Sequence, residues 1–194
     1  MNPFRSLFTI ITLGVLLQGV ALADTVTDRS GRRIQVDRPF QRIISLYGAH
    51  TENLFRLGLK EEIVGVGRNE AYPPEALEKP AFSYHDDAEK FMALRPDLVL
   101  IRPMIDRVYQ PFVRKLEMAG ITVASLQPVG VEDMYRYWRD LGILTGKQAE
   151  AEAMVRSFEA GLAAIRDLVE KIPPKARKRE IGRASCRERV CHRV

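Results

Sequence analysis

The sequence has 194 residues, with 30 Lys and Arg against 25 Asp and Glu, and 46% of its residues are hydrophobic. This composition is typical of a globular chain and excludes an intrinsically disordered one, and the length fits a single domain. Both cysteines, Cys186 and Cys191, lie in the last nine residues, which excludes a thiol site or a disulfide framework in the rest of the chain.

The net charge of +5 is carried by the two ends of the sequence. Residues 1–23 contribute one base and no acid, and residues 175–194 contribute eight bases against two acids. Residues 24–174 hold 21 bases and 23 acids. A nucleic-acid partner, which a basic protein would suggest, therefore has no support in the body of the chain.

Residues 1–23 have the pattern of a signal peptide. Arg5 precedes an apolar run from Leu7 to Leu17, and Ala21-Leu22-Ala23 is a small-x-small cleavage signal. The apolar run is shorter than the roughly 20 residues that span a bilayer, and no cysteine follows it for lipid attachment. The pattern predicts export to the periplasm as a soluble protein without a lipid anchor.

Short apolar runs then alternate with segments of helical period. A β-hairpin is predicted over 25–36, strands over 43–47, 63–66, 97–101 and 121–126, and helices over 51–57, 87–94, 108–119, 131–145 and 147–171. Thr51 is the expected N-cap of its helix, and residues 68–84 are expected to form a polar loop. Strands separated by helices predict an α/β fold with βαβ crossovers in a small parallel-sheet lobe. The last helix, about 37 Å long, has the length of one that crosses a domain or joins two.

Four stretches in this order resemble the N-terminal lobe of periplasmic solute-binding proteins of the ferric-siderophore and cobalamin uptake class: RIISLYGAHTENLFRLGLKEEIVGV, AYPPEAL, AEKFMALRPDLVLI and LEMAGITVASLQP. The resemblance covers residues 25–172. It implies two α/β lobes joined by a long helix, with the ligand in the cleft between them. Here the second lobe would be missing, so the chain would be a truncated form that binds poorly alone.

The resemblance also implies a division of the chain. Residues 1–23 would be the signal peptide, 24–130 the N-terminal lobe, 131–172 helices that include the connector between lobes, and 173–194 a linker and a disordered tail. The terminal stretch EIGRASCRERVCHRV resembles an adapter-derived peptide rather than a natural continuation. We expect this stretch to be foreign sequence.

In an α/β sheet the binding groups collect on loops beyond the carboxyl ends of the strands. These loops offer guanidinium groups for an anionic chelate and aromatic rings for its apolar surface. The candidate ligand-binding residues are Tyr47, His50, Arg68, Asn69, Tyr84, His85, Arg102 and Met104. We expect no catalytic residue, no resident metal and no cofactor, because the ligand itself would be a metal chelate.

The implied function is that of the substrate-binding component of an ABC importer. It would capture an iron-siderophore, haem or cobalamin-type chelate in the periplasm, as a monomer, and deliver it to the permease subunits in the inner membrane. Glu89 stands where the family carries an exposed glutamate that docks on arginines of the permease. An ordinary acid in the first turn of a helix is the alternative for this residue.

Two other functions remain open from the sequence. A solute-binding protein for zinc or manganese could use His50 and His85, although sites for these ions usually have three or more protein ligands. An exported α/β enzyme is the other alternative. Against it, the sequence has no G-x-S-x-G, H-E-x-x-H or G-x-G-x-x-G motif and no phosphate-binding loop.

Overall fold

The computed structural model describes residues 24–173 and residue 176, so the predicted signal peptide and most of the predicted tail lie outside the described residues. The strands are β1 (Asp24–Thr27), β2 (Arg33–Val36), β3 (Ile43–Ser45), β4 (Ile63–Gly67), β5 (Ala81–Phe82), β6 (Leu98–Ile101) and β7 (Thr122–Ser125). The helices are α1 (Gly48–Arg56), the 3-10 helix η1 (Pro74–Glu78), α2 (Ala88–Ala93), α3 (Pro103–Val108), α4 (Gln110–Met118), α5 (Val131–Thr145) and α6 (Gln148–Glu170).

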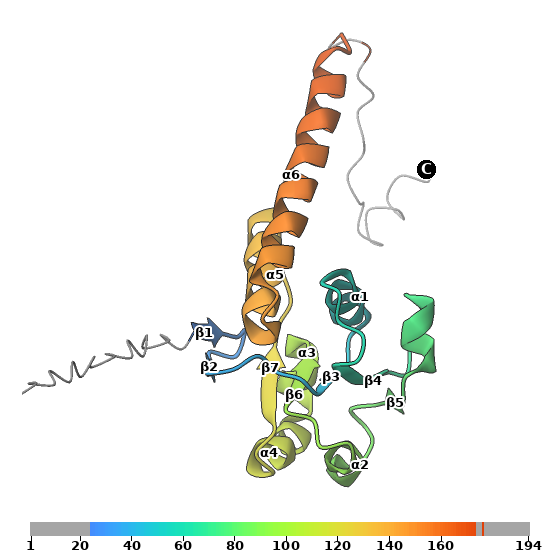
Figure 1. Cartoon of the computed structure of the whole chain (residues 1–194), viewed down its shortest axis with the longest axis vertical. Helices are drawn as coiled ribbons and strands as arrows, with labels where there is room; N and C mark the ends of the chain where they lie inside the picture. Colours follow the sequence, from blue (N-terminus) through green and yellow to red (C-terminus); the bar gives the residue numbers. More distant parts are fainter. Residues whose placement is uncertain (1–23, 174–175, 177–194) are drawn as a thin grey trace, which may run out of the picture.

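Five of the strands form a parallel sheet in the order β5-β4-β3-β6-β7. The chain starts at the central strand β3 and runs outward to β5, then returns to pair β6 with β3 and runs outward to β7 (Figure 1). The direction of winding therefore reverses between β3 and β6. This α/β architecture with βαβ crossovers confirms the predicted fold class.

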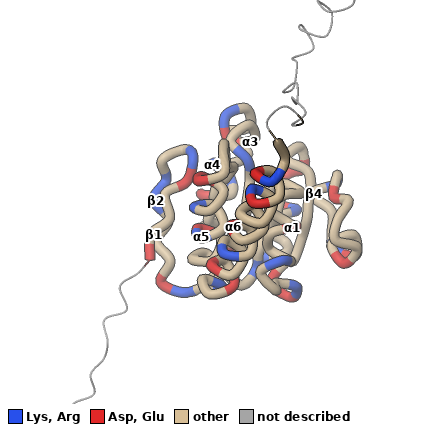
Figure 2. The backbone as a smooth tube through the Cα atoms, turned by 90° about the horizontal axis from the view of Figure 1, so that it is seen from above, with Lys and Arg blue, Asp and Glu red and all other residues tan. Residues whose placement is uncertain are grey.

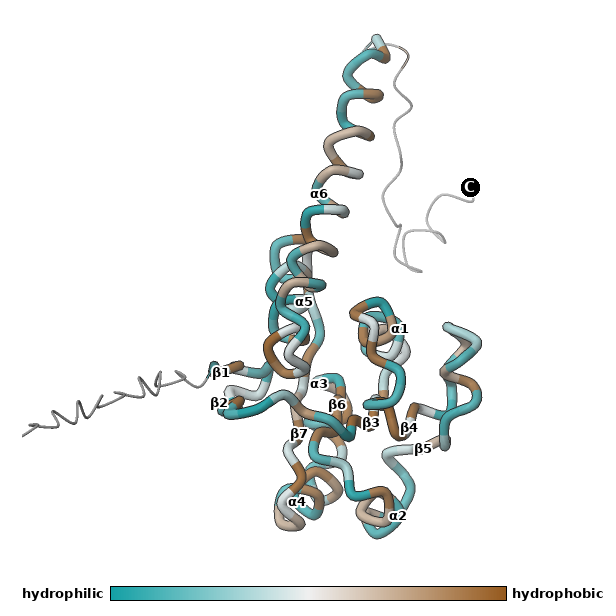
Figure 3. Tube along the Cα trace, in the orientation of Figure 1, coloured by the Kyte–Doolittle hydropathy of each residue, from teal (hydrophilic) through white to brown (hydrophobic). Residues whose placement is uncertain are grey.

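Helices cover both faces of the sheet, because successive strand side chains point to opposite sides. Ile43, Leu98 and Leu100 face a core formed with α1, α5 and the β1–β2 hairpin. Ile44 and Val99 face a second core formed with α2, α3 and α4. All four residues of β6 are buried, and Figure 3 shows hydrophobic stretches along the strands of the sheet.

The predicted N-terminal hairpin is confirmed, with β1 antiparallel to β2 and Val26 opposite Ile34. Its turn lies over the end of β7. There the buried Asp28 carboxylate accepts a hydrogen bond from the Ser125 backbone N–H at 2.9 Å. The hairpin thus closes one edge of the lobe.

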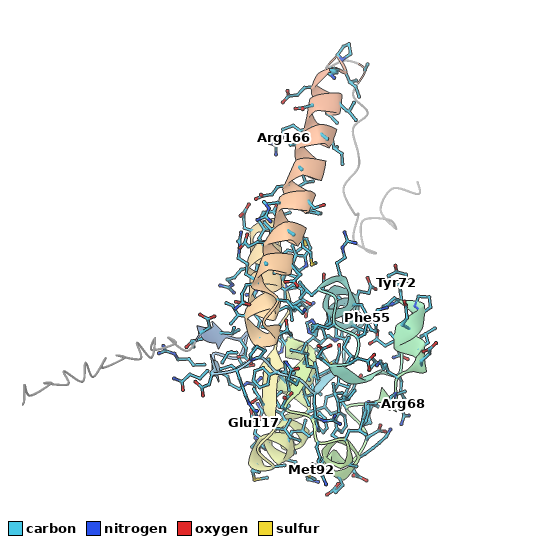
Figure 4. The ribbon with its side chains drawn as sticks, viewed as in Figure 1. Phe55, Arg68, Tyr72, Met92, Glu117 and Arg166 are labelled. Carbon is cyan, nitrogen blue, oxygen red and sulfur yellow. The ribbon has the colours of Figure 1, made fainter. Side chains whose placement is uncertain are left out.

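The last two helices are joined by a tight turn at Gly146, whose φ of +70° favours glycine. A Cβ atom at Gly142 would lie 2.8 Å from the Cβ of Ala151, so α5 and α6 can approach closely only with glycine there. Ala151 and Val155 are buried, but further along α6 Ile165 is 58% exposed. Figure 1 shows this part of α6 projecting away from the lobe, and Figure 4 places Arg166 on it.

Three local predictions differ from the structure. Helix α1 begins at Gly48 rather than at Thr51, which lies inside it. The loop predicted over 68–84 contains η1 and β5, and a two-residue edge strand is too short to show a period. The helix predicted over 108–119 is confirmed as α4 but begins at Gln110, because Val108 ends a separate helix, α3, that was not predicted. Both helices have a proline in the first turn, where its missing N–H is not needed.

Within the described part of the chain, no helix combines the length and apolar character needed to cross a membrane. Figure 2 shows basic and acidic positions interspersed over the backbone of the lobe.

Candidate ligand-binding site

A pocket of about 570 Å³ opens at the carboxyl edge of the sheet, where the winding reverses between β3 and β6. This is the position where open α/β sheets bind ligands. Segments that follow β3, β4, β5 and β6 all contribute to its walls. The lining residues are Leu46, Tyr47, Gly48, Gly67, Arg68, Asn69, Glu70, Phe82, Ser83, Tyr84, His85, Arg102 and Ile105.

Another hollow, of about 490 Å³, lies between α1, α5 and α6 and is lined mainly by apolar helix side chains such as Trp138 and Leu162. It is remote from the strand ends. We therefore take the pocket at the sheet edge as the candidate site, because it alone of these two brings together side chains from several strand-following loops.

Tyr47 and Arg102 form one wall of the pocket. Tyr47 is the residue before α1, and Arg102 is the residue before α3, so each helix start carries one of them. The guanidinium carbon of Arg102 lies 5.5 Å from the ring centroid of Tyr47, which is a cation–π contact. Arg102 lines the pocket and pairs with no carboxylate of the described residues, so its guanidinium is available for an anionic group.

Arg68 lines the opposite side, but its charge is already paired. Its Nη2 lies 2.6 Å from Oδ1 of Asp86, whose Oδ2 also accepts from Lys90 at 2.7 Å. The hydrogen bond from Lys90 is the largest of the contacts that lower the pKa of Asp86. Arg68 therefore lines the pocket as part of this ion pair, and its contact with a ligand stays a prediction. Figure 4 shows its position on the β4–β5 side.

An aromatic cluster of Tyr84, His85 and Tyr109 stands at the pocket rim. The ring centroids of Tyr84 and Tyr109 are 4.6 Å apart, and the Tyr109 hydroxyl lies 3.4 Å from Nε2 of His85. Tyr84 and His85 also line an adjoining hollow of about 380 Å³. The sequence pointed to Tyr84 and His85 but not to Tyr109, whose position depends on the break between α3 and α4.

Glu70 is a second residue that the candidate set missed. Its Oε1 accepts a hydrogen bond from Thr51 Oγ1 at 3.1 Å, while the buried Oε2 has no hydrogen-bond partner among the described residues. Burial raises the pKa of the carboxyl. A Cβ atom at Gly48 or Gly67 would lie within about 3.3 Å of these oxygens, so the two glycines make the space for this carboxylate.

Replacing Glu70 by glutamine should stabilise the protein by about 1 kcal/mol at pH 7, because a neutral amide costs less to bury than a charged carboxylate with one unpartnered oxygen. The raised pKa means that the folded state takes up a proton before the unfolded state does. The advantage of Glu70→Gln should therefore shrink as the pH falls and the wild-type carboxyl becomes neutral. Urea unfolding at pH 7 and pH 4 measures both values. The exposed Glu78→Gln is the matched control, and an equal gain in both variants would contradict the assignment.

His50 does not line the pocket, which corrects its place in the candidate set. The residue is 0% exposed, with Nδ1 2.7 Å from the Tyr137 hydroxyl and Nε2 3.2 Å from the backbone oxygen of Ile101. Burial lowers the pKa of His50 to about 4. Both ring nitrogens are therefore engaged inside the lobe. Met104 is also absent from the pocket wall and packs, half-buried, against the core on the α2–α4 face.

The histidines do not assemble a metal site. His50 lies in the interior, whereas His85 belongs to the aromatic cluster at the rim. Residues 24–173 and 176 contain no group of three or more His, Cys, Asp or Glu side chains placed to hold a metal ion. Both nitrogens of His50 already have hydrogen-bond partners, so the ligand pair on which a zinc or manganese site would depend does not form.

Glu89 lies in the first turn of α2 and is exposed. It forms no ion pair with another described residue, unlike the nearby Asp86. Its carboxylate is therefore free to meet a partner, which is the condition for the docking role predicted from the sequence.

Comparison with known proteins agrees with this fold. A family model described as periplasmic binding protein matches residues 43–179. An uncharacterized ABC transporter substrate-binding lipoprotein of Bacillus subtilis is 28% identical over 151 residues, which cover 76% of this chain and 48% of that protein. A vitamin B12-binding protein of Vibrio cholerae is 32% identical over 98 residues, or 50% of this chain and 35% of that protein.

Solved structures of similar fold include a periplasmic heme binding protein from Pseudomonas aeruginosa, with 27% identity and a TM-score of 0.60 over 66% of this chain and 46% of that one. An ABC-type Fe3+-hydroxamate transport protein from Saccharomonospora viridis has 27% identity and a TM-score of 0.60 over 77% and 58%. The chain spans less than half the length of the curated relatives it matches. Because the family model covers most of its length, the chain belongs to the periplasmic binding protein family.

Proposed function

We propose that this chain is one lobe of the substrate-binding component of an ABC importer for a metal chelate. The family acts in substrate binding for transport and is located in the periplasm or otherwise outside the cytoplasm. The observation that carries the proposal is the pocket at the sheet edge, which combines aromatic rings with the unpaired guanidinium of Arg102. The lobe would act there as an exported monomer without a catalytic role.

The lining chemistry suits an iron-siderophore, haem or cobalamin-type chelate. Such ligands present apolar ring surfaces together with carboxylate or amide groups at their edges. Tyr47 and Tyr84 offer ring faces for the apolar surface, Arg102 offers N–H donors for an anionic edge, and His85 offers an imidazole at the rim. Relatives whose names describe binding of vitamin B12 or heme support this ligand class.

The proposal is tested by titrating the chain with haemin, cyanocobalamin and ferrichrome and following the NMR signals of the pocket residues. We expect one of the three to bind, with low affinity because a single lobe supplies only part of a cleft. Arg102→Ala should weaken binding about tenfold or more, since a hydrogen bond to a charged group contributes about 1.5–3 kcal/mol.

Arg107→Ala is the matched control, because Arg107 is exposed on the same helix and does not line the pocket. The Arg107→Ala variant should bind the chelate with the same affinity as the wild type. Failure of all three chelates to perturb the pocket signals, or equal effects of the two substitutions, would contradict the proposal.

Glu89 supports a second part of the proposal, namely docking to a basic surface of the permease. The exposed carboxylate would orient the lobe through charge-assisted hydrogen bonds. Glu89→Gln should weaken association with the membrane-embedded permease about fivefold and reduce its dependence on salt, measured by biolayer interferometry. Glu132→Gln, an exposed acid in the first turn of α5, is the control. Equal association of both variants would argue that Glu89 is only a helix-terminal acid.

A further inference from the structure

His50 lies directly beneath the point where the winding of the sheet reverses. It belongs to the first turns of α1, which follow β3, and its Nε2 reaches the backbone oxygen of Ile101 at the end of β6 at 3.2 Å. It therefore bridges the two neighbouring strands whose loops form one wall of the pocket. Because its side chain is fully buried, any influence on a ligand must act through other residues.

The hydrogen bonds of His50 define its form. A backbone oxygen can only accept, so Nε2 carries the proton and donates it to Ile101. Nδ1 is then an acceptor, and the Tyr137 hydroxyl donates to it over 2.7 Å. Burial raises the pKa of Tyr137 and lowers that of His50, so both groups stay neutral and this arrangement persists at physiological pH.

The imidazole of His50 contacts Tyr47 directly and contacts the residue that precedes Arg102. Ile101 is the residue immediately before Arg102, so the hydrogen bond to Ile101 holds the backbone from which Arg102 extends. On the other side the ring of Tyr47 meets that of His50 edge-on, with centroids 5.1 Å apart and an interplanar angle of 84°. Tyr47 in turn carries Arg102 on its face at 5.5 Å.

Helix α5 anchors this arrangement from below. Besides the hydrogen bond from Tyr137 to His50, Trp138 Nε1 donates to Oδ1 of Asn53 at 2.8 Å. Two successive residues of α5 are thus tied to one face of α1. The imidazole cannot shift without breaking one of these contacts.

We infer that His50 is a positioning residue, which sets the relative placement of Tyr47 and Arg102 for ligand binding without touching the ligand. The expected effect on affinity rests on the proposed function. The placement of Tyr47 against Arg102 exists without a ligand and can be measured in the free protein. An apolar side chain of similar size would fill the same space but remove the acceptor of the Tyr137 hydroxyl and one of the two donors to the Ile101 oxygen, which would keep only the backbone N–H of Leu126 at 2.9 Å.

The test uses His50→Phe, which keeps an aromatic ring but has no nitrogen, and His50→Gln, which keeps a donor and an acceptor. The first readout is the upfield NMR shift that the Tyr47 ring induces in the side-chain protons of Arg102, measured without ligand. His50→Phe should reduce this shift by at least half, and His50→Gln should largely restore it. Should His50→Phe fail to fold, Tyr137→Phe removes only the hydroxyl and should reduce the shift in the same direction.

The second readout is affinity for whichever of haemin, cyanocobalamin and ferrichrome the wild type binds. His50→Phe should weaken it about tenfold, and in an Arg102→Ala background the same substitution should have almost no further effect. The control is Thr145→Val at the end of α5. It removes another buried hydroxyl, which donates to the Leu141 oxygen, and Thr145 does not line the pocket. It should lower stability and leave both readouts unchanged.

The outcomes separate the two ideas. A wild type that binds none of the three chelates counts against the proposed function, while the Arg102 shift still tests the role of His50. Unchanged Arg102 signals in His50→Phe and Tyr137→Phe would overturn the positioning role. So would additive losses of affinity from His50→Phe and Arg102→Ala in a wild type that does bind.

Discussion

Replacing Asp28 by alanine should lower the free energy of unfolding by about 3–5 kcal/mol, the range for removing one partner of a buried ion pair. The side chain is fully buried, and its Oδ1 accepts from the backbone N–H groups of Ser30 and Arg32 at 2.9 Å each. Its Oδ2 accepts from Nε of Arg32 and from the backbone N–H of Ser125. Alanine would leave the three backbone N–H groups and Nε of Arg32 without this acceptor, and the Arg32 guanidinium would keep only its carboxylate partners Asp106 and Glu117.

Asp28→Ala should also affect the candidate site, through Arg32 and the helix α3. Arg32 donates to both carboxylate oxygens of Asp106, at 3.1 and 2.7 Å, and to Glu117 at 3.3 Å. Asp106 lies on α3, the helix that begins directly after Arg102. The Asp28–Arg32 pair therefore ties the hairpin to the helix that presents the pocket arginine, and Asp28→Ala should loosen both.

Urea unfolding at pH 7 measures this effect. Asp37→Ala removes an exposed acid just after β2 and should change stability by no more than about 0.5 kcal/mol. If Asp28→Ala costs less than about 1 kcal/mol, Asp28 would have to be replaceable by water, and the hairpin would not be a fixed part of the lobe.

Truncating Phe91 to alanine should cost about 3–5 kcal/mol, since a fully buried phenylalanine loses its transfer free energy and leaves a cavity. Its ring centroid lies 4.7 Å from that of Phe82 and 5.0 Å from that of Phe112, so it joins β5, α2 and α4. Because Phe82 also lines the pocket, the cavity would lie directly behind the wall that carries Tyr84 and His85.

Equilibrium unfolding gives the cost of Phe91→Ala, and amide hydrogen exchange over α2 shows whether the loss is local. Phe158→Ala is the matched control, because Phe158 is 37% exposed on α6 and should lose clearly less stability. Equal losses for the two phenylalanines would mean that α2 is not held by its core contact.

The local sequence pattern determined much of the fold. The hairpin, the sheet strands β3, β4, β6 and β7, and the long helices α5 and α6 were all predicted within a few residues of their bounds. The spacing of apolar and polar residues depends only on neighbouring positions in the chain, so it predicts strands and helices without knowledge of the tertiary structure. Short elements were missed for the same reason, because β5 has only two residues and shows no period.

For the site, the sequence identified the loops but not what each side chain does in them. The loops follow from topology, since parallel strands bring their carboxyl ends to one edge. Which side chain faces the pocket depends on partners far away in the chain. His50 is turned inward by Tyr137, 87 residues later, and Arg68 is engaged by Asp86.

The sequence by itself thus determined an α/β lobe whose body carries slightly more acids than bases, with the basic excess at the two ends. It also located the strand-following loops that hold Tyr47, Tyr84, His85 and Arg102. Only the tertiary structure decided that Arg102 keeps its donors open, that Glu70 and Tyr109 join the site, and that His50 supports it from the core. The physical reason is that charge pairing and burial are set by contacts between distant segments, which local periodicity does not encode.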